Sequence, residues 1–145
     1  MIVTLFVTLL LVGLTVLIHF EALLRLSDFM VSPRHRFRVN LIVCILGALI
    51  AHVIEVWIFG LGYFYLTGFK EFGWFEGLAA QPTLGDCGYY SFVTYTTLGF
   101  GDLIPKGPIR FLTGMEALTG LLLITWTASF MYLQMQKFWK TGLTN

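Results

Sequence analysis

Charged residues are scarce in this chain. Nine Lys and Arg and eight Asp and Glu make up 12% of its 145 residues, whereas charged residues are about 25% of an ordinary globular domain. A net charge of +1 excludes a basic surface for nucleic acid, and 57% hydrophobic residues exclude a disordered chain. The mean hydropathy of +0.82 is instead typical of an integral membrane protein.

Cysteines and catalytic motifs are also few. Cys44 lies in an apolar stretch and Cys87 in a polar one, so they are predicted at different membrane depths and no disulfide joins them. Two isolated cysteines do not form a metal-binding framework. The sequence holds no nucleophile–base set and no cofactor motif, so we expect neither an enzyme nor a bound cofactor.

Three apolar runs are long enough to cross a bilayer, which takes about 20 residues. The first extends from Ile2 to Ile18 and on to Phe20, the second covers 39–66, and the third is an inner helix over 108–135 with Pro108 in its first turn. No basic residue precedes the first run and no small-residue cleavage site follows it, which argues against a signal peptide. The sequence predicts three membrane crossings.

Basic residues predict the orientation of these crossings. They cluster between the first two runs and after the third: Arg25, Arg34, Arg36, Arg38, Lys137 and Lys140. Because basic loops stay in the cytoplasm, we expect an N-terminus outside and a cytoplasmic C-terminus in the cell membrane, in the manner of a bacterial inner-membrane protein. Both clusters lie on one side only if the segment 88–102 enters the membrane and returns to the face that it left.

This re-entrant segment is predicted to change from helix to extended chain. Residues 88–96 can form a short helix that Asp86 caps at its start. The next residues, 97–101, cannot continue the helix because they contain Gly99 and Gly101. Glycine readily adopts positive φ, and alternating left- and right-handed angles would turn successive carbonyl oxygens toward one side.

The segment Thr96-Thr-Leu-Gly-Phe-Gly-Asp102 resembles the selectivity-filter signature of potassium channels, commonly Thr-Thr-Val-Gly-Tyr-Gly-Asp. The likeness covers 39–135, and this region is similar to bacterial channels with a two-helix pore domain. It continues in three further segments: Tyr89-Tyr90-Ser91, 105–110 and 116–120. Leu98 and Phe100 replace Val and Tyr, and Val93 stands where some members have Glu.

The resemblance implies an all-α membrane protein that assembles as a homotetramer in lipid and passes K⁺ passively. Four copies would stack backbone carbonyl rings that replace the hydration shell of the ion. The implied ion-binding residues are Thr97, Leu98, Gly99, Phe100 and Gly101, with K⁺ at the first four and support from Thr96, Asp102, Tyr89 and Tyr90. The side chains of Leu98 and Phe100 are expected to pack against the short helix. A non-conducting pore-fold subunit and a non-selective cation channel are the alternatives.

The expected domains are an N-terminal helix with a basic loop (1–38), a pore domain (39–135) and a short cytoplasmic tail (136–145). Within the pore domain we expect an outer helix (39–66), an external loop with the pore helix (67–96), a filter (97–102) and an inner helix (108–135).

Several ionisable residues fall within or beside the predicted spans. His52, Glu55 and Glu116 are expected either to sense protons or to brace the pore helix through hydrogen bonds, and they lack a diagnostic metal-ligand spacing. His19 is grouped with Glu21 and Arg25 on a solvated or headgroup-facing surface, with the last two as a helical ion pair.

Four residues of the inner helix are candidates for gating. Gly114 and Gly120 could be bending points, because glycine weakens a helix locally. Trp126 and Phe130 lie one turn apart and either form an apolar constriction or face lipid, since the sequence does not determine the rotation of this helix.

Overall fold

The computed structural model describes residues 2–29 and 37–142, with side chains described over 2–29 and 39–136. Its elements in chain order are α1 (Ile2–Phe29), α2 (Phe37–Thr67), β1 (Trp74–Glu76), α3 (Leu84–Tyr95), β2 (Ile104–Lys106) and α4 (Ile109–Gly142). The basic side chains that predict orientation, apart from Arg25, lie outside the described residues: Arg34, Arg36, Arg38, Lys137 and Lys140.

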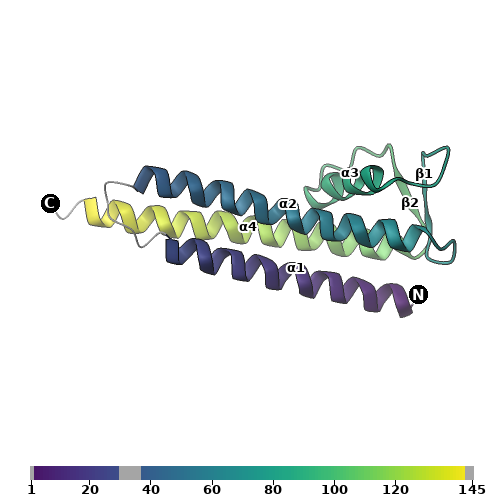
Figure 1. Cartoon of the computed structure of the whole chain (residues 1–145), viewed down its shortest axis with the longest axis horizontal. Coiled ribbons are helices and arrows are strands. Elements are labelled where there is room, and N and C mark those ends of the chain that lie inside the picture. Colours follow the sequence, from purple (N-terminus) through teal and green to yellow (C-terminus); the bar gives the residue numbers. More distant parts are fainter. Residues whose placement is uncertain (1, 30–36, 143–145) are drawn as a thin grey trace.

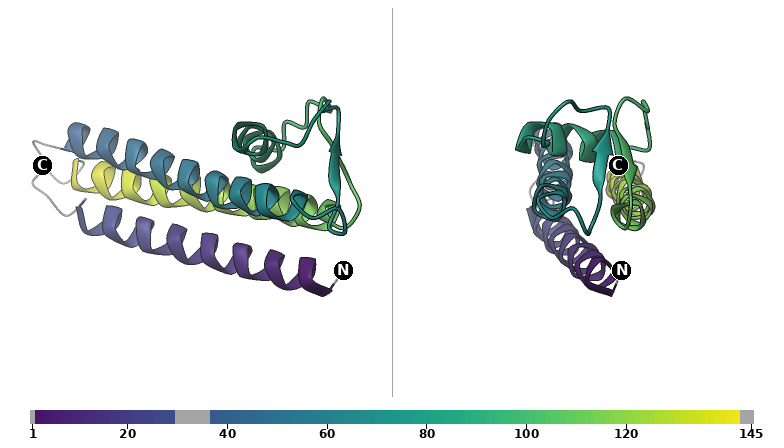
Figure 2. Two further views of the ribbon diagram at one scale, coloured as in Figure 1. Left: turned by 45° about the vertical axis from the view of Figure 1, so that its right-hand side comes forward. Right: turned by 90° about the vertical axis from the view of Figure 1, so that its right-hand side faces the viewer.

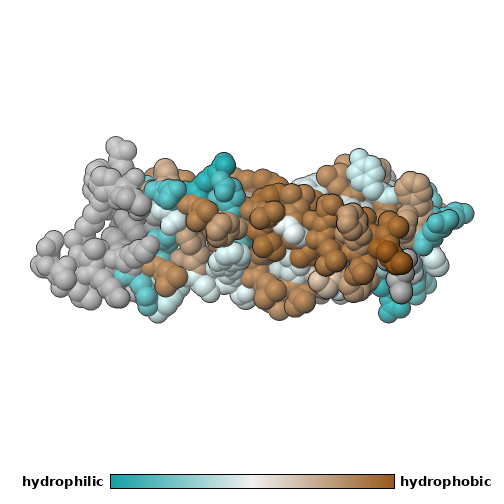
Figure 3. Space-filling view, turned by 90° about the horizontal axis from the view of Figure 1, so that it is seen from below, coloured by the Kyte–Doolittle hydropathy of each residue, from teal (hydrophilic) through white to brown (hydrophobic). Residues whose placement is uncertain are grey.

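Three long helices lie side by side and form the body of the molecule (Figure 1). Their stretches over 2–29, 39–67 and 109–136 are each long enough to cross a membrane, and each contains an 18-residue apolar segment, with mean hydropathies of 2.5, 2.5 and 1.3. On the face shown in Figure 3, hydrophobic surface covers most of the middle, and hydrophilic residues gather at the right-hand end and beside the grey residues on the left. The prediction of a mostly helical, multi-pass membrane protein is confirmed.

The described helices extend beyond the apolar runs from which they were predicted. α1 continues to Phe29, past the predicted end at Phe20, and α4 continues to Gly142, past the predicted 135. A hydropathy pattern measures the apolar stretch, whereas backbone hydrogen bonding continues into the polar residues that follow. Pro108 immediately precedes α4, and its carbonyl accepts from the amide of Phe111 (3.1 Å).

One face of α1 packs against the other two long helices. Its buried residues recur every three or four positions: Thr4, Thr8, Leu11, Thr15, His19 and Leu23. The hydroxyls of Thr8 and Thr15 donate to carbonyls of the preceding turn, at 2.7 and 3.0 Å, so these polar side chains tolerate an apolar environment. The outward face carries large apolar residues such as Leu17 and is suited to lipid.

The segment between α2 and α4 leaves the bundle and returns to the same end (Figure 2). α3 begins with a capping box in which the Thr83 hydroxyl accepts from the amide of Asp86 and the Asp86 carboxylate accepts from the amide of Thr83. Thr83 is therefore the N-cap, and the expectation that Asp86 caps the helix is wrong by three positions. The pKa of Asp86 is lowered by the hydroxyl and amide of Thr83, which both donate to its carboxylate.

A small antiparallel sheet that we did not predict joins the two ends of this segment. β1 and β2 pair with Trp74 opposite Lys106, and the Lys106 ammonium lies 2.7 Å from the carboxylate of Glu76. The strands approach closely because Gly73 has a φ of 127°, and a Cβ there would lie 2.2 Å from the Lys106 carbonyl oxygen. The sheet holds the two connections of α3 together.

A core between α2, α3 and α4 fixes the position of α3. It includes the fully buried Phe59, Tyr63, Cys87 and Ile109. Full burial of a large apolar side chain contributes about 1.5–3 kcal/mol, so these contacts anchor the short helix firmly. Both cysteines are free and buried, as we expected from their different environments. Burial raises the pKa of Cys87 to about 11.

Candidate functional site

The segment that follows α3 begins with a turn that terminates the helix. Thr96 is the C-cap, and Thr97 after it has a positive φ of 60°. The amide of Thr97 donates to the carbonyl of Thr94 (2.9 Å), and the amide of Leu98 donates to that of Val93 (3.0 Å). This pair of bonds is the Schellman arrangement, which closes a helix around a left-handed residue and redirects the chain.

Positive φ angles alternate along residues 97–101. Thr97, Gly99 and Gly101 have φ of 60°, 56° and 80°, whereas Leu98 and Phe100 between them do not have positive φ. A left-handed conformation costs roughly 1–2 kcal/mol for a residue with a Cβ and little for glycine. A Cβ at Gly99 or Gly101 would meet no atom of this chain within 4 Å, so the backbone angle, not local crowding, requires glycine here.

The carbonyl oxygens of residues 97–101 accept no hydrogen bond within the described part of the chain. The side chains beside them are also uncovered, since Leu98 is 62% and Phe100 is 67% exposed. Within one chain these two side chains therefore do not pack closely against α3, contrary to expectation.

The predicted support residues surround this segment. The Tyr89 hydroxyl donates to the Asp102 carboxylate (2.8 Å), and this bond raises the pKa of Tyr89. The Tyr90 hydroxyl lies 3.0 Å from that of Thr113 on α4. Because Tyr89 lies within α3 and Asp102 follows residues 97–101, their bond ties the far end of this segment back to α3.

A protein-family model described as "ion channel" matches residues 51–137, which is more than half of the chain. The chain belongs to this ion channel family. The matched residues of the channel run from α2 through α3 and residues 97–101 into α4. Comparisons with curated proteins and with solved structures found no match.

A first buried polar cluster of the channel braces the middle of α3. Glu116 on α4 is fully buried, and its carboxyl group contacts the hydroxyls of Tyr63 (2.6 Å) and Ser91. Ser91 also lies 2.7 Å from the carbonyl of Val56 on α2. These bonds connect the short helix α3 to α2 and α4.

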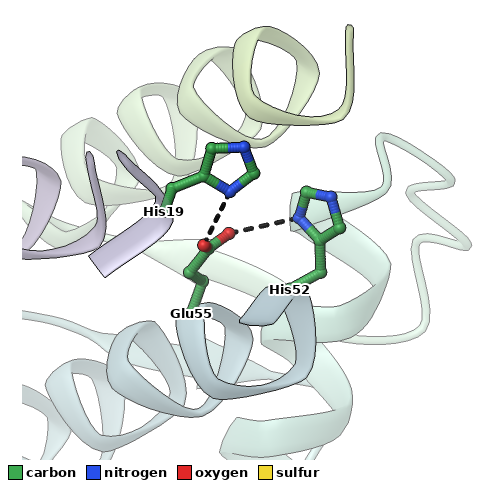
Figure 4. Close-up of side chains that lie close together, drawn as sticks. All are labelled: His19, His52 and Glu55. Atoms are coloured by element: carbon green, nitrogen blue, oxygen red, sulfur yellow. Dashed lines mark hydrogen bonds and ion pairs between the residues drawn. The ribbon is translucent and has the colours of Figure 1, made fainter. Parts of the chain in front are cut away.

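A second buried polar cluster meets the end of α3. One oxygen of Glu55 lies 2.9 Å from Nδ1 of His19 and the other lies 3.2 Å from Nδ1 of His52 (Figure 4). Tyr95, the last residue of α3, contacts both Glu55 and His52 through its hydroxyl. Nε2 of each histidine faces the hydroxyl of Thr127 on α4, at 3.2 Å for His19 and 3.0 Å for His52.

The structure corrects the placement of His19. This residue is completely buried and contacts Glu55, so the prediction of a solvated or headgroup-facing position is wrong. Only Glu21 and Arg25 are exposed, and they form the predicted ion pair at 2.8 Å. A signal for His19 was present in the sequence, because it continues the helical spacing of Thr8 and Thr15 on one face of α1.

Glu55 and Glu116 belong to different clusters and make no hydrogen bond to each other in the described structure. Donor atoms of His19, His52 and Glu55 lie within 4.8 Å of one another. Each of these atoms already has a protein hydrogen-bond partner, so hydrogen bonding accounts for the arrangement.

The four candidate gating residues have different surroundings. α4 runs through Gly114 and Gly120 without interruption. A Cβ at Gly120 would lie 2.2 Å from the carbonyl oxygen of Tyr95, so this glycine allows α4 to approach the end of α3, whereas Gly114 has open space. The Trp126 ring lies 5.5 Å from that of His19, which places it against α1, and Phe130 is half-buried.

Proposed function

We propose that this ion channel conducts K⁺ selectively through residues 97–101 of four identical chains. The observation that carries the proposal is the alternation of positive φ at Thr97, Gly99 and Gly101, together with five carbonyl oxygens that have no hydrogen-bond partner among the described residues. Alternating angles turn successive peptide units so that their oxygens face the same side. Carbonyl oxygens arranged in this way are ligands for a dehydrated monovalent cation.

The proposal requires several copies because one chain offers oxygens on one side of an ion only. Four chains around an axis complete each ring, with the Thr97 hydroxyl at the inner end and Asp102 at the outer mouth. Neighbouring chains would also cover Leu98 and Phe100, which a single chain leaves exposed. α3 supports a cation path, since its C-terminal end carries a partial negative charge and leads directly into this segment.

The same geometry supports the proposed orientation. The segment containing α3 would enter the membrane from outside and return, and the N-terminus of α1 lies at the same end of the molecule (Figure 1). The N-terminus would then face outward and the C-terminus the cytoplasm of a bacterial cell.

A flux assay with the purified channel in liposomes tests the proposal. Uptake of a radioactive Rb⁺ tracer, driven by an internal K⁺ load, is expected and should be blocked by external Ba²⁺. Replacing internal K⁺ with Na⁺ should abolish the uptake. Equal uptake with both ions would indicate a non-selective channel, and no uptake under any condition would indicate a non-conducting subunit.

Two glycine variants connect that assay to the geometry. Gly101→Ala places a Cβ on a residue with φ of 80°, and we expect loss of K⁺ selectivity or of conduction. Gly13→Ala is the matched control, because Gly13 also has open space around it but lies in α1 without a positive φ. Unchanged K⁺ preference in Gly101→Ala would contradict the assignment of the filter.

A further inference from the structure

The buried cluster around Glu55 connects four helices through a closed set of polar contacts. It contains His19 from α1, His52 and Glu55 from α2, Tyr95 from α3 and Thr127 from α4. His19, Glu55 and Tyr95 are buried, and His52 and Thr127 are half-buried. The number of protons in such a cluster can be counted, because each contact between two polar atoms needs one hydrogen.

The six contacts need five hydrogens. His19 Nδ1 bonds to Glu55, and Tyr95 bonds to Glu55. His52 Nδ1 faces both Glu55 and Tyr95, so one shared hydrogen serves these two contacts, and the Nε2 atom of each ring faces Thr127. With Glu55 ionised and both rings neutral, the two rings and the two hydroxyls supply only four. Both rings then use their hydrogen at Nδ1, and the single hydrogen of Thr127 faces two Nε2 lone pairs.

One additional proton completes the set. If either ring is an imidazolium, its Nε2–H donates to Thr127 and the Thr127 hydroxyl donates to the other ring. With either ring protonated the cluster has no net charge, which is the favoured state in a medium of low dielectric constant.

We propose that His19, His52 and Glu55 form a binding site for one proton per chain, which the two rings share through the hydroxyl of Thr127. The proton strengthens the attachment of α1 to the pore region, because without it the Thr127 hydroxyl can donate to only one of the two rings. Raising the pH removes the proton and leaves one contact of the cluster without a hydrogen. The contact most readily lost is one of those made by His19, since α1 carries only this residue of the cluster.

The charged and titratable groups around the site are few. From α1 only His19 faces it, and Glu21 and Arg25 pair with each other at the surface. From α2 the facing groups are His52 and Glu55 and from α3 Tyr95. From α4, whose side chains are described to 136, the polar group that faces the site is Thr127. Glu116 bonds to Tyr63 and Ser91 in the separate cluster.

Regulation follows if residues 97–101 conduct, and this step rests on the proposed function. Tyr95 is two residues before Thr97 and its hydroxyl contacts Glu55 and His52. A change in the cluster therefore reaches the end of α3 directly, where the Schellman turn positions the first filter-like residue. We expect K⁺ flux to change with pH in step with loss of the shared proton.

The histidine ring nitrogens report the proton without reference to ion flux. Protein labelled with ¹⁵N-histidine in liposomes is measured by solid-state NMR across a pH series, and His35→Gln identifies the signals of the remaining histidine. We expect the rings of His19 and His52 together to hold about one imidazolium proton at one end of the series and none at its alkaline end. Two neutral rings throughout the range in which the protein is folded would overturn the site.

Two substitutions at Thr127 separate the shared proton from simple packing. Thr127→Val removes the hydroxyl that receives the proton, so the loss of a hydrogen bond to a charged group should move the transition to lower pH by about one to two units. Thr127→Ser retains the hydroxyl and should leave the transition in place. Thr125→Val is the matched control on α4, because the hydroxyl of Thr125 bonds only to backbone carbonyls of its own helix.

Two other results would overturn the proton site. One is an unchanged pH transition in Thr127→Val. The other is one bound metal ion per chain whose removal by a chelator also removes the ring signals assigned to the proton. If Thr127→Val does not fold, the wild-type proton count and Thr127→Ser still test it. A normal proton transition without K⁺ flux would contradict the proposed function alone, and flux without the transition would contradict the proton site alone.

Discussion

Glu55 and Glu116 are two fully buried carboxyl groups with different neighbours. Each contacts α3, Glu116 through Ser91 and Glu55 through Tyr95 one helical turn later. Among the described residues, Glu116 bonds to the hydroxyls of Tyr63 and Ser91, whereas Glu55 bonds to two imidazole rings and the Tyr95 hydroxyl. The same residue type at the same burial therefore has a possible cationic partner in one cluster and none in the other.

The contacts of Glu116 show how this difference affects its proton. Ser91 has one hydrogen and two acceptors, the Val56 carbonyl and an oxygen of Glu116. Both contacts are complete only if Glu116 carries a proton and donates to Ser91, so we expect a neutral carboxylic acid there. Both clusters then have no net charge, but only the Glu55 cluster reaches neutrality by sharing a proton with histidine.

Glu55→Gln is expected to cause the largest loss of stability. An amide has a hydrogen-donating end, which must face the N–H of His19 or of His52, and the neutral side chain removes the partner of the shared proton. We expect a loss of about 3 kcal/mol in the free energy of unfolding, the lower end of the range for breaking a buried charged pair. Denaturant unfolding in detergent, followed by circular dichroism, measures this loss, and a change near zero would contradict the charged description of Glu55.

Gly120→Ala is expected to have the next largest effect. A Cβ at this position would lie 2.2 Å from the Tyr95 carbonyl oxygen, which is backbone and cannot rotate away. We predict a loss of about 1–3 kcal/mol from overpacking, measured in the same assay. Gly114→Ala has open space and should gain up to about 1 kcal/mol from its higher helix propensity.

Glu116→Gln should be milder than Glu55→Gln. If Glu116 is a neutral acid, the amide replaces one neutral group with another of the same shape, and its N–H₂ can donate to Ser91 in place of the acid proton. We expect a loss of about 1 kcal/mol or less. Equal losses for the two glutamine variants would remove the difference between the clusters.

The smallest effect is expected at Asp86, a solvated carboxylate at the start of α3. Its pKa is lowered by the Thr83 hydroxyl and amide, so the ionised form is favoured in the folded state. This contribution is complete above the ordinary pKa of about 3.9 and is lost as the pH falls through the lower folded value. Amide exchange in the first turn of α3 should accelerate only under such acidic conditions, and Asp86→Asn should remove this pH dependence.

Local patterns in the sequence predicted the three long helices and the break after α3. The apolar runs contain enough residues to span a bilayer, and two glycines in 97–101 indicated positive φ, which the structure has at both and also at Thr97. The Thr97 angle comes from the Schellman turn, whose hydrogen bonds stabilise a left-handed residue that composition alone does not indicate.

Contacts between distant segments were harder to predict. β1 and β2 contain three residues each, and no alternating pattern can be read from strands so short. Trp126 could not be assigned to lipid or to a constriction, because its neighbours His19 and Phe20 belong to a helix far away in the sequence. Asp86 was identified in the correct turn but in the wrong role, since the capping box also needed Thr83.

The sequence by itself determined that the chain crosses a membrane and that residues 97–101 leave the helical conformation. Both properties depend on local chemistry, namely the hydropathy of long runs and the φ angles open to glycine. Only the tertiary structure decided that His19 joins Glu55, His52 and Thr127 and that Glu116 does not. A buried polar side chain takes its role from the donors and acceptors that packing brings within about 3 Å, and those come from helices far apart along the chain.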